Sequence, residues 1–465
     1  MFTCFHHHPL KTANAIRGFS LVELMIVVAI IGTLLGLAVP QYSDYLRRAK
    51  LTDGTALLAN YRVSVEQYYQ DKAGPPQNKM VIVFGILGSL LVGLGIVLIL
   101  AHNWDQLSRV IKTVFAFLPL VAGQAICAYA LWKQRDSTVW REAGSTFLVL
   151  AIGACISLIS QIYNISGSLD AFLLTWAVLT LPIIYVMRSS TASLLFIIGI
   201  TWYACETGYW GHDAHESYVY WGLLLLALPH YYFLYKQHSE SNFFTFHNWF
   251  IPLSVIIALG TIATDIEEMM FIAYMSLFGL LYLIGNTRIL RDQKIRNNGY
   301  LVLGSLGTAV LLLFLSFDWF WEELRVKDFS TEQWMASPEF IVSIMLTLAA
   351  VALLVYQKKN EKPLNIKPAE FVFILLIGIF LVGLSSPLVT LLINILALAV
   401  GILTIREGAR NYHFGILNYG LLIVTALVIC RFFDTDLSFI LRGMLFVGVG
   451  FGFFFANYWM SKKKR

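Results

Sequence analysis

The chain is built largely from long apolar runs, and these runs constrain its fold more than any other feature. From residue 80 onward, stretches of roughly 20 apolar residues, the length that crosses a bilayer as a helix, follow one another with short connections. Of the 465 residues, 58% are hydrophobic and 13% are charged, about half the charged share of a soluble protein. A soluble fold of this size cannot bury so much apolar surface, so we expect most of the chain to lie in a lipid bilayer.

In hydrocarbon, a chain of such runs satisfies its backbone N–H and C=O groups by forming helices. The sequence therefore predicts an all-α, polytopic membrane helix bundle with about fourteen spans after an N-terminal helix. The expected spans are 80–101, 110–131, 143–163, 170–187, 191–207, 218–235, 249–264, 268–285, 299–316, 338–356, 369–384, 387–403, 413–431 and 438–458. We divide them into membrane hairpins over 78–190 and a further bundle over 191–465.

Lys and Arg are distributed unequally between the alternate loops of this scheme. One side of the membrane carries 20 of them and the other carries 5. Because Lys and Arg collect in cytoplasmic loops, this predicts a multi-pass protein of the bacterial inner membrane with its C-terminus in the cytoplasm. The net charge of +5 comes without a basic soluble module, so we expect no nucleic-acid partner.

Residues 17–40, RGFSLVELMIVVAIIGTLLGLAVP, form the most specific motif in the chain. The apolar run from Phe19 to Val39 is long enough to span a bilayer, and one acid, Glu23, interrupts it near its start. A carboxylate in hydrocarbon costs roughly 2.5–3.5 kcal/mol, so Glu23 needs either a partner or a shallow position near the headgroups. The candidate cleavage point after Gly18 precedes the apolar run, whereas an ordinary signal peptide is cut after it.

This stretch resembles the N-terminus of type IV pilins, and the resemblance continues weakly to residue 77. It implies that prepilin peptidase removes residues 1–18 by cutting after Gly18, and that Phe19 becomes the methylated first residue. It also implies that Glu23 contacts the amino terminus of a neighbouring subunit. Residues 19–77 then resemble the long pilin helix without its globular head, because no strand-rich segment follows.

The next hairpins show a second resemblance. The order NWD, REA and QIYNISG is similar to a family of uncharacterised bacterial membrane proteins, domain-of-unknown-function family 2157. The matching residues are Asn103, Trp104, Asp105, Arg141, Glu142, Gln161, Ile162, Tyr163, Ser166 and Gly167. The resemblance covers about residues 80–190, and it implies a membrane location and a polytopic architecture but no reaction.

The two resemblances disagree about orientation. A pilin stem inserts with its N-terminus in the cytoplasm and places residues 41–79 outside, whereas the charge pattern of the bundle places Lys79 inside. Either the stem inserts in reverse, or 80–101 is not a span, or two separate reading frames have been joined. We favour a fusion.

Few side chains suggest site chemistry. His212 and His215, three residues apart, and Glu216 are the best candidate metal ligands, but we favour a solvated acidic loop as their explanation. The chain has no GxSxG, P-loop or strand-borne GxGxxG motif, so we expect neither an enzyme nor a cofactor. For transport, the notable polar groups inside apolar runs are Gln124, His230, Asn394 and Asn418.

We therefore expect a non-enzymatic inner-membrane protein whose main partner is the lipid bilayer and whose candidate role is transporter-like. The alternative is a membrane-resident component of a type IV pilus or type II secretion machinery, with prepilin peptidase and other components of these systems as partners.

Overall fold

A computed structural model describes residues 106–210, 217–263, 267–287, 289–291, 293–326, 337–359 and 370–432, with scattered positions between 440 and 454. The chain divides into two compact units at Gln106 and Leu107, and the described residues belong almost entirely to the second unit. The expected leader, pilin-like helix and first span, which include Gly18, Phe19 and Glu23, lie outside the described residues.

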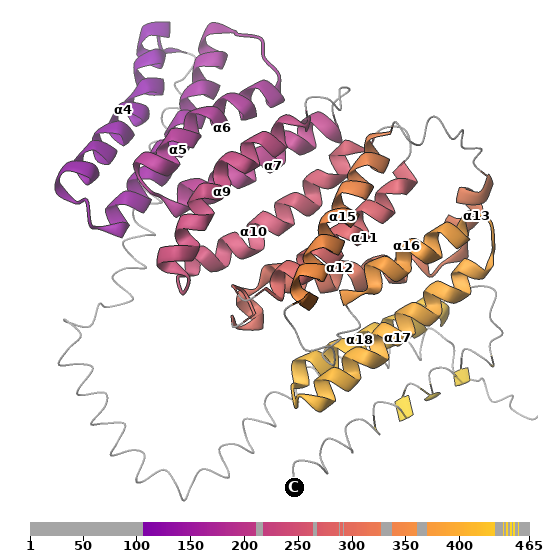
Figure 1. The fold of residues 1–465 in the computed structure, drawn as a ribbon. Coiled ribbons are helices and arrows are strands. Elements are labelled where there is room, and N and C mark those ends of the chain that lie inside the picture. The colour runs from indigo at the N-terminus through magenta and orange to yellow at the C-terminus, as the bar shows by residue number, and fades with distance from the viewer. Residues whose placement is uncertain are drawn as a thin grey trace, which may run out of the picture. The chain divides into compact units, whose positions relative to one another are not determined.

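The described part of the chain is helical and contains no strand, which confirms the all-α prediction there (Figure 1). The first six helices are α4 (Arg109–Lys133), α5 (Thr138–Tyr163), α6 (Leu169–Val186), α7 (Ser190–Gly208), α9 (Val219–His238) and α10 (Asn242–Leu259). They are followed by α11 (Met270–Gly285), α12 (Gly299–Leu315), α13 (Asp318–Val326), α15 (Pro338–Lys359), α16 (Val372–Gly383), α17 (Leu388–Arg410) and α18 (Phe414–Phe432). Single 3₁₀ turns occur at Gly260–Ile262, Glu267–Met269 and Ile295–Asn297.

Serine side chains begin several of these helices. Ser108, Ser189 and Ser241 each accept a hydrogen bond from the backbone N–H three residues ahead, at the starts of α4, α7 and α10. Such caps satisfy donors that have no partner inside the helix. Because the turns between consecutive helices span only a few residues, as at 134–137, 187–189 and 239–241, these neighbours run antiparallel.

The apolar core of the described residues consists of two large clusters and a small one formed by Ala409 and Leu417. One of the large clusters joins α4, α5, α6, α7, α9 and the end of α10. The other surrounds α11, which contacts α10, α12, α15 and α16 and lies between α10 and the C-terminal helices in Figure 1. Twelve of the sixteen residues of α11 are buried, so this helix is enclosed by protein.

Two hydrogen bonds tie α15 to α11 in a parallel orientation. Ser343 Oγ donates to Met269 O (3.2 Å) where the two helices begin, and Gln357 Nε2 donates to Leu283 O (2.9 Å) where they end. The ends of α11 and α15 therefore lie on the same side of the bundle.

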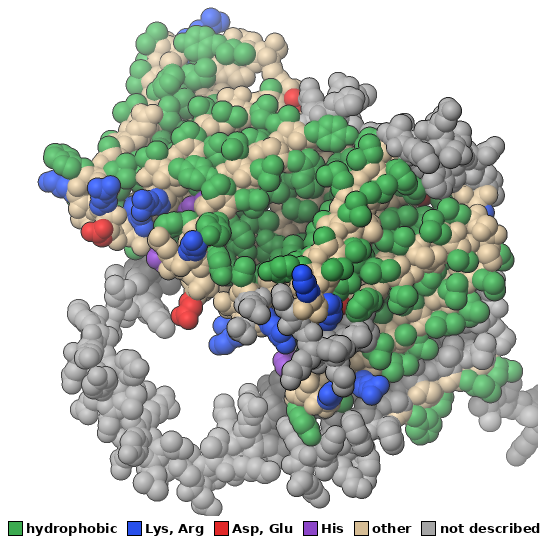
Figure 2. All heavy atoms as spheres, in the orientation of Figure 1, with side chains coloured by type: hydrophobic (Ala, Val, Ile, Leu, Met, Phe, Trp, Pro, Cys, Tyr) green, Lys and Arg blue, Asp and Glu red, His purple; other side chains and the backbone are tan. Residues whose placement is uncertain are grey.

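Basic side chains gather on that side, along one edge of the surface in Figure 2. We call this the basic end; it holds Lys133, Arg135, Arg141, Arg188, Lys236, Arg291, Lys294, Arg296, Lys358, Lys359, Arg406 and Arg410. Of the described residues at the opposite end, four are basic: Arg109, Lys112, Arg325 and Arg431.

Large apolar side chains also cover the outside of the helices. On α4, Val110, Val114, Leu118 and Val121 are all more than half exposed, while the buried residues of this helix lie on its opposite face. An apolar outer face of this kind suits contact with lipid rather than with water.

The expected count of about fourteen spans is not supported. The described residues include seven helices that are long and apolar enough to cross a membrane, or eight if the bent pair α12–α13 counts as one span. With 19 and 20 residues, α7 and α9 are long enough to cross a membrane. Their polar and aromatic side chains make them too weakly apolar to count as spans. With 16 and 12 residues, α11 and α16 are about 24 and 18 Å long, less than the roughly 30 Å of hydrocarbon.

The apolar runs therefore correctly indicated helices, but not every one of these helices is long and apolar enough to cross a membrane. The expected span 80–101 lies outside the described residues, as does most of 438–458.

Candidate functional site

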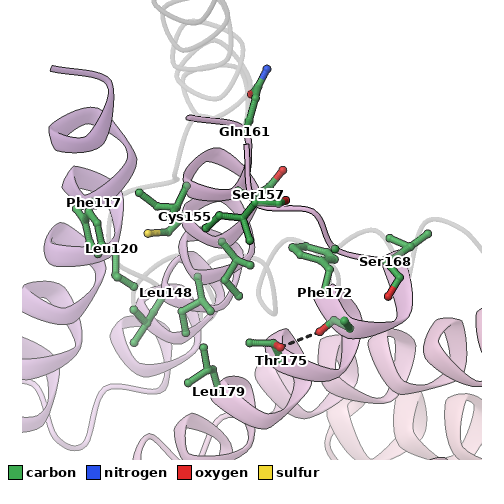
Figure 3. Close-up of a pocket in the computed structure, with 18 of the residues that line it drawn as sticks. Phe117, Leu120, Leu148, Cys155, Ser157, Gln161, Ser168, Phe172, Thr175 and Leu179 are labelled. Atoms are coloured by element: carbon green, nitrogen blue, oxygen red, sulfur yellow. Dashed lines mark hydrogen bonds between the residues drawn. The ribbon is translucent and has the colours of Figure 1, made fainter. Parts of the chain in front are cut away.

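A large cavity among the described residues lies between α4, α5 and α6, at the end of the bundle opposite the basic end (Figure 3). Its volume is about 1170 Å³, slightly above the usual range of small-molecule pockets. Phe117 from α4, Leu148 from α5 and Phe172 from α6 contribute to its apolar wall.

The turn between α5 and α6 forms the rim of this cavity. Asn164 adopts the left-handed conformation (φ 50°), which an asparagine tolerates and which ends α5. Ser160 then holds the turn, because its hydroxyl donates to Ile165 O (2.9 Å) and its carbonyl accepts from the N–H of Ile165 (2.9 Å). These bonds fix the path of residues 165–168 above the cavity.

The lining of the cavity is uncharged. No Asp, Glu, Lys, Arg or His is among the residues that line it. Its polar groups are amides and hydroxyls, from Gln124, Ser157, Ser160, Gln161, Ser166, Ser168 and Thr175. Such a lining suits an uncharged ligand with a large apolar part, because nothing in the cavity wall compensates a buried charge.

The structure brings three of the family-like residues together at this cavity: Gln161, Ser166 and Gly167. Tyr163 is half exposed and points elsewhere, with its hydroxyl 3.0 Å from Thr113 Oγ1 on α4. The remaining predicted residues of this set, Asn103, Trp104 and Asp105, lie outside the described residues.

Sequence reasoning missed the hydroxyl groups of Ser157, Ser160 and Thr175. The signal for the first two was their spacing, because Ser157, Ser160 and Gln161 are three and four residues apart and share one face of α5. Gln124 was identified as a polar group inside an apolar run, and the structure places it in the cavity wall.

Glu142, also matched to the family, lies away from the cavity. Its carboxylate receives hydrogen bonds from Ser189 Oγ (2.6 Å) and from the backbone N–H groups of Ser190 (2.9 Å) and Thr191 (2.8 Å). It therefore caps the start of α7, where helix N–H groups lack partners.

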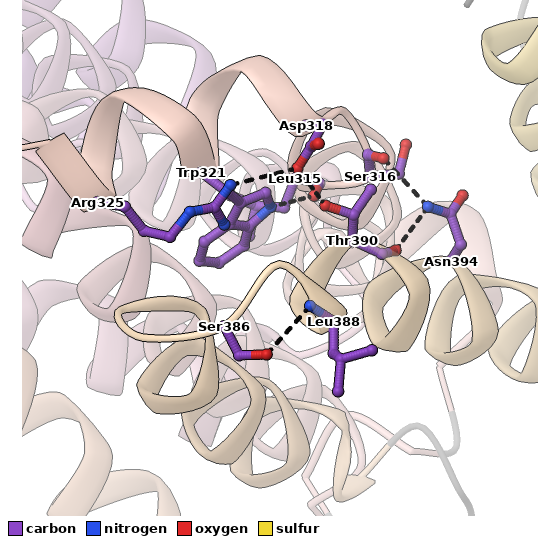
Figure 4. Close-up of polar contacts among 9 residues, drawn as sticks. All are labelled: Leu315, Ser316, Asp318, Trp321, Arg325, Ser386, Leu388, Thr390 and Asn394. Carbon is purple, nitrogen blue, oxygen red and sulfur yellow. Dashed lines mark hydrogen bonds and ion pairs between the residues drawn. The ribbon is translucent and has the colours of Figure 1, made fainter. Parts of the chain in front are cut away.

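A second polar cluster occupies the break between α12 and α13, whose axes differ by 70° (Figure 4). Thr390 Oγ1 donates to Asp318 Oδ1 (2.7 Å), and Asp318 Oδ1 also lies 3.8 Å from Arg325 Nη2. Asn394 Nδ2 donates to Ser316 O (3.1 Å) at the end of α12. Polar groups at a helix break are a feature of transporter sites, but here they contact one another and the helix ends.

The candidate metal ligands His212, His215 and Glu216 lie outside the described residues. Within the ranges that the structure describes, no group of three or more His, Cys, Asp or Glu side chains is placed to hold a metal ion.

Comparisons with known families match two parts of the chain. Residues 13–39 match a family described as "Prokaryotic N-terminal methylation motif". Residues 49–193 match a family described as "Predicted membrane protein (DUF2157)". Both resemblances inferred from the sequence are thereby confirmed.

Curated relatives align with the N-terminal part. The fimbrial protein EcpC of Eikenella corrodens is 45% identical over 56 residues, 12% of this chain and 37% of the relative. A type IV major fimbrial protein FimA of Dichelobacter nodosus is 39% identical over 79 residues, 17% of this chain and 47% of the relative. A type IV major pilin protein PilE1 of Neisseria gonorrhoeae is 40% identical over 62 residues, 13% of this chain and 38% of the relative.

The chain thus spans less than half the length of these relatives. No solved structure matches it. The chain joins an N-terminal stretch similar to type IV pilins to a segment that matches a family of predicted membrane proteins.

Proposed function

We propose that the protein is a non-enzymatic, transporter-like protein of the bacterial inner membrane that binds an uncharged amphipathic molecule in the cavity between α4, α5 and α6. The observation that carries the proposal is the large cavity itself, whose wall is apolar and whose polar groups are all amides and hydroxyls. A monoacylglycerol has the required chemistry, since its acyl chain suits the wall and its hydroxyls suit the rim.

The orientation that we propose follows from the charges at the helix ends. Of the basic residues that the structure describes, twelve lie at the basic end and four at the opposite end, and loops rich in Lys and Arg remain in the cytoplasm. With the basic end in the cytoplasm, the cavity lies toward the periplasmic face of the membrane.

Photo-crosslinking with a diazirine-bearing monoacylglycerol, in vesicles that contain the full chain, tests the ligand. We expect label on peptides of α4, α5 and α6, and several-fold less label with the diazirine fatty acid, whose carboxylate has no counter-charge in the cavity. Ser157→Trp places a bulky ring in the cavity without replacing a core residue and should reduce the labelling several-fold.

Leu225→Trp is the matched control, because Leu225 on α9 is 65% exposed and does not line the cavity. Equal labelling of the wild type, Ser157→Trp and Leu225→Trp would contradict the proposal.

The second candidate function is a membrane-resident component of a type IV pilus or type II secretion machinery. The match of residues 13–39 to the methylation motif and the similarity to pilins support it. It predicts cleavage after Gly18 and methylation of Phe19. Mass spectrometry of the mature N-terminus, in cells with and without prepilin peptidase, tests this, and an uncleaved chain in cells with active peptidase excludes it.

A further inference from the structure

Two buried histidines lie close together near the basic end, where α7, α9 and α10 meet. His230 on α9 and His247 on α10 are 4% and 0% exposed, and their ring centroids are 5.9 Å apart. Each ring is near a serine of α7: His230 Nε2 lies 3.4 Å from Ser190 Oγ, and His247 Nε2 lies 3.0 Å from Ser193 Oγ.

The contacts of His247 define which of its nitrogens can take up a proton. Its Nδ1 lies 2.8 Å from Phe243 O, and because a carbonyl only accepts, Nδ1 carries the hydrogen. In the neutral ring, Nε2 is therefore the acceptor and the Ser193 hydroxyl donates to it. A proton added at Nε2 is accommodated by rotating the Ser193 hydroxyl, so that its oxygen accepts instead.

Glu142 of α5 supplies a negative charge beside this pair. Its Oε1 accepts from the backbone N–H of Ser190, the residue whose hydroxyl is next to His230. Within the described part of the chain, neither of the ion pairs involves Glu142, so its carboxylate is held by the Ser189 hydroxyl and by N–H groups at the start of α7.

The other titratable or charged groups that face the histidines are few. The Tyr231 ring on α9 stacks on His247 at 6.2 Å. Arg188, in the turn before α7, lies over Phe233, which in turn stacks on His230. His238 packs edge-on against the same Phe233 ring, so this ring separates both Arg188 and His238 from His230.

The Glu142 side of the cluster faces a groove in the surface at the basic end. Glu142 lines a shallow groove of about 670 Å³, together with Thr138, Thr191 and Phe243. Thr191 donates to the same carboxylate through its N–H, so the groove reaches the start of α7 directly.

We propose that His230 and His247 form a binding site for a single proton, with Glu142 as its counter-charge and the groove beside Glu142 as its entrance. A hydronium ion transfers its proton to Nε2 of one ring: one N–H bond forms, one O–H bond breaks and water leaves. A second proton is excluded because two imidazolium rings 5.9 Å apart repel each other in a medium of low dielectric constant. The site is independent of the ligand proposed for the cavity between α4, α5 and α6.

Nitrogen-15 NMR of ring-labelled histidines tests this in the full chain in lipid nanodiscs, because neutral and cationic imidazoles differ in their shifts. We expect the pair to take up one proton in total between pH 8 and pH 4. Glu142→Gln should lower the affinity of the pair for this proton by about tenfold, because it removes the counter-charge. Glu240→Gln is the matched control, in the exposed α9–α10 turn, and should change it less than about twofold.

His247→Asn keeps a donor for Phe243 O but has no titratable nitrogen, and it should leave His230 to take up the proton alone. The proposal is overturned if both rings stay neutral to pH 4, if each ring takes up its own proton independently, or if the two Glu variants behave alike.

Discussion

Side chains of α17 and α18 bind Ser316, where α12 ends. Asn394 donates to the carbonyl of Ser316, and Arg431 Nη2 lies 3.4 Å from Ser316 Oγ. The last carbonyls of a helix have no partner within it, so Asn394 stabilises the end of α12 at the bend, whereas Arg431 binds the side chain of Ser316. The sequence predicted a polar group at Asn394 but not its partner, because that partner depends on where α12 stops.

Thr390→Val tests the cluster at this bend. Valine keeps the shape of threonine but removes the hydroxyl that donates to Asp318, so we expect the free energy of unfolding to fall by about 1–2 kcal/mol. Tryptophan fluorescence during thermal unfolding of the purified protein measures the change. Thr404→Val is the control on the same helix, because its hydroxyl donates only to Val400 O within α17. Equal losses for the two variants would show that the bond to Asp318 has no special importance.

At the scale of the elements, two glycines mark positions where the backbones of α17 and α18 lie close together. A Cβ built on Gly408 would lie 2.3 Å from the backbone N of Leu417, and one on Gly420 would lie 2.6 Å from the backbone N of Ile405. Glycines of this kind let membrane helices pack backbone against backbone.

Gly408→Ala should therefore force the α17–α18 pair apart. We expect a loss of about 1–3 kcal/mol in the free energy of unfolding, seen as a lower midpoint of thermal unfolding. Gly222→Ala in α9 is the control, because a Cβ there meets nothing within 4 Å. An unchanged midpoint for Gly408→Ala would mean that the two helices do not touch at this position.

The elements also show how far sequence reasoning extended. A span was predicted over 338–356, and α15 runs from Pro338 to Lys359. The prediction agrees closely with the helix because two lysines mark the end of its apolar run. In contrast, residues 317–337 fall between two expected spans, yet they include α13 (Asp318–Val326). The buried side chains of Phe320, Trp321 and Leu324 follow helical spacing, a signal hidden by the acids between them.

The cavity could not be predicted in the same way. Its wall combines side chains from three helices, and a pattern along one helix does not determine which neighbour each side chain meets. Gln161 at the end of α5 and Ser166 and Gly167 in the turn after it were identified by resemblance alone, and only the packing of α4, α5 and α6 places them at one rim.

For the whole molecule, the separation of charge between the two ends predicts which turns face the cytoplasm. Asp136→Cys lies in the α4–α5 turn at the basic end, and Ser166→Cys lies in the α5–α6 turn at the opposite end; both positions are exposed. In a chain without its native cysteines, a membrane-impermeant maleimide should label Ser166→Cys in intact spheroplasts. It should label Asp136→Cys only after permeabilisation. The reverse pattern would place the basic end in the periplasm.

The shortness of α16 has an electrical consequence. This helix is about 18 Å long, and the α16–α17 turn at its end lies beside the cluster of Asp318 and Thr390 (Figure 4). Where the apolar layer is thinned to match such a helix, the membrane voltage falls over a shorter distance and the local field is steeper. The ion pair of Asp318 and Arg325 lies beside this turn, so under such thinning its dipole would be exposed to the steeper field.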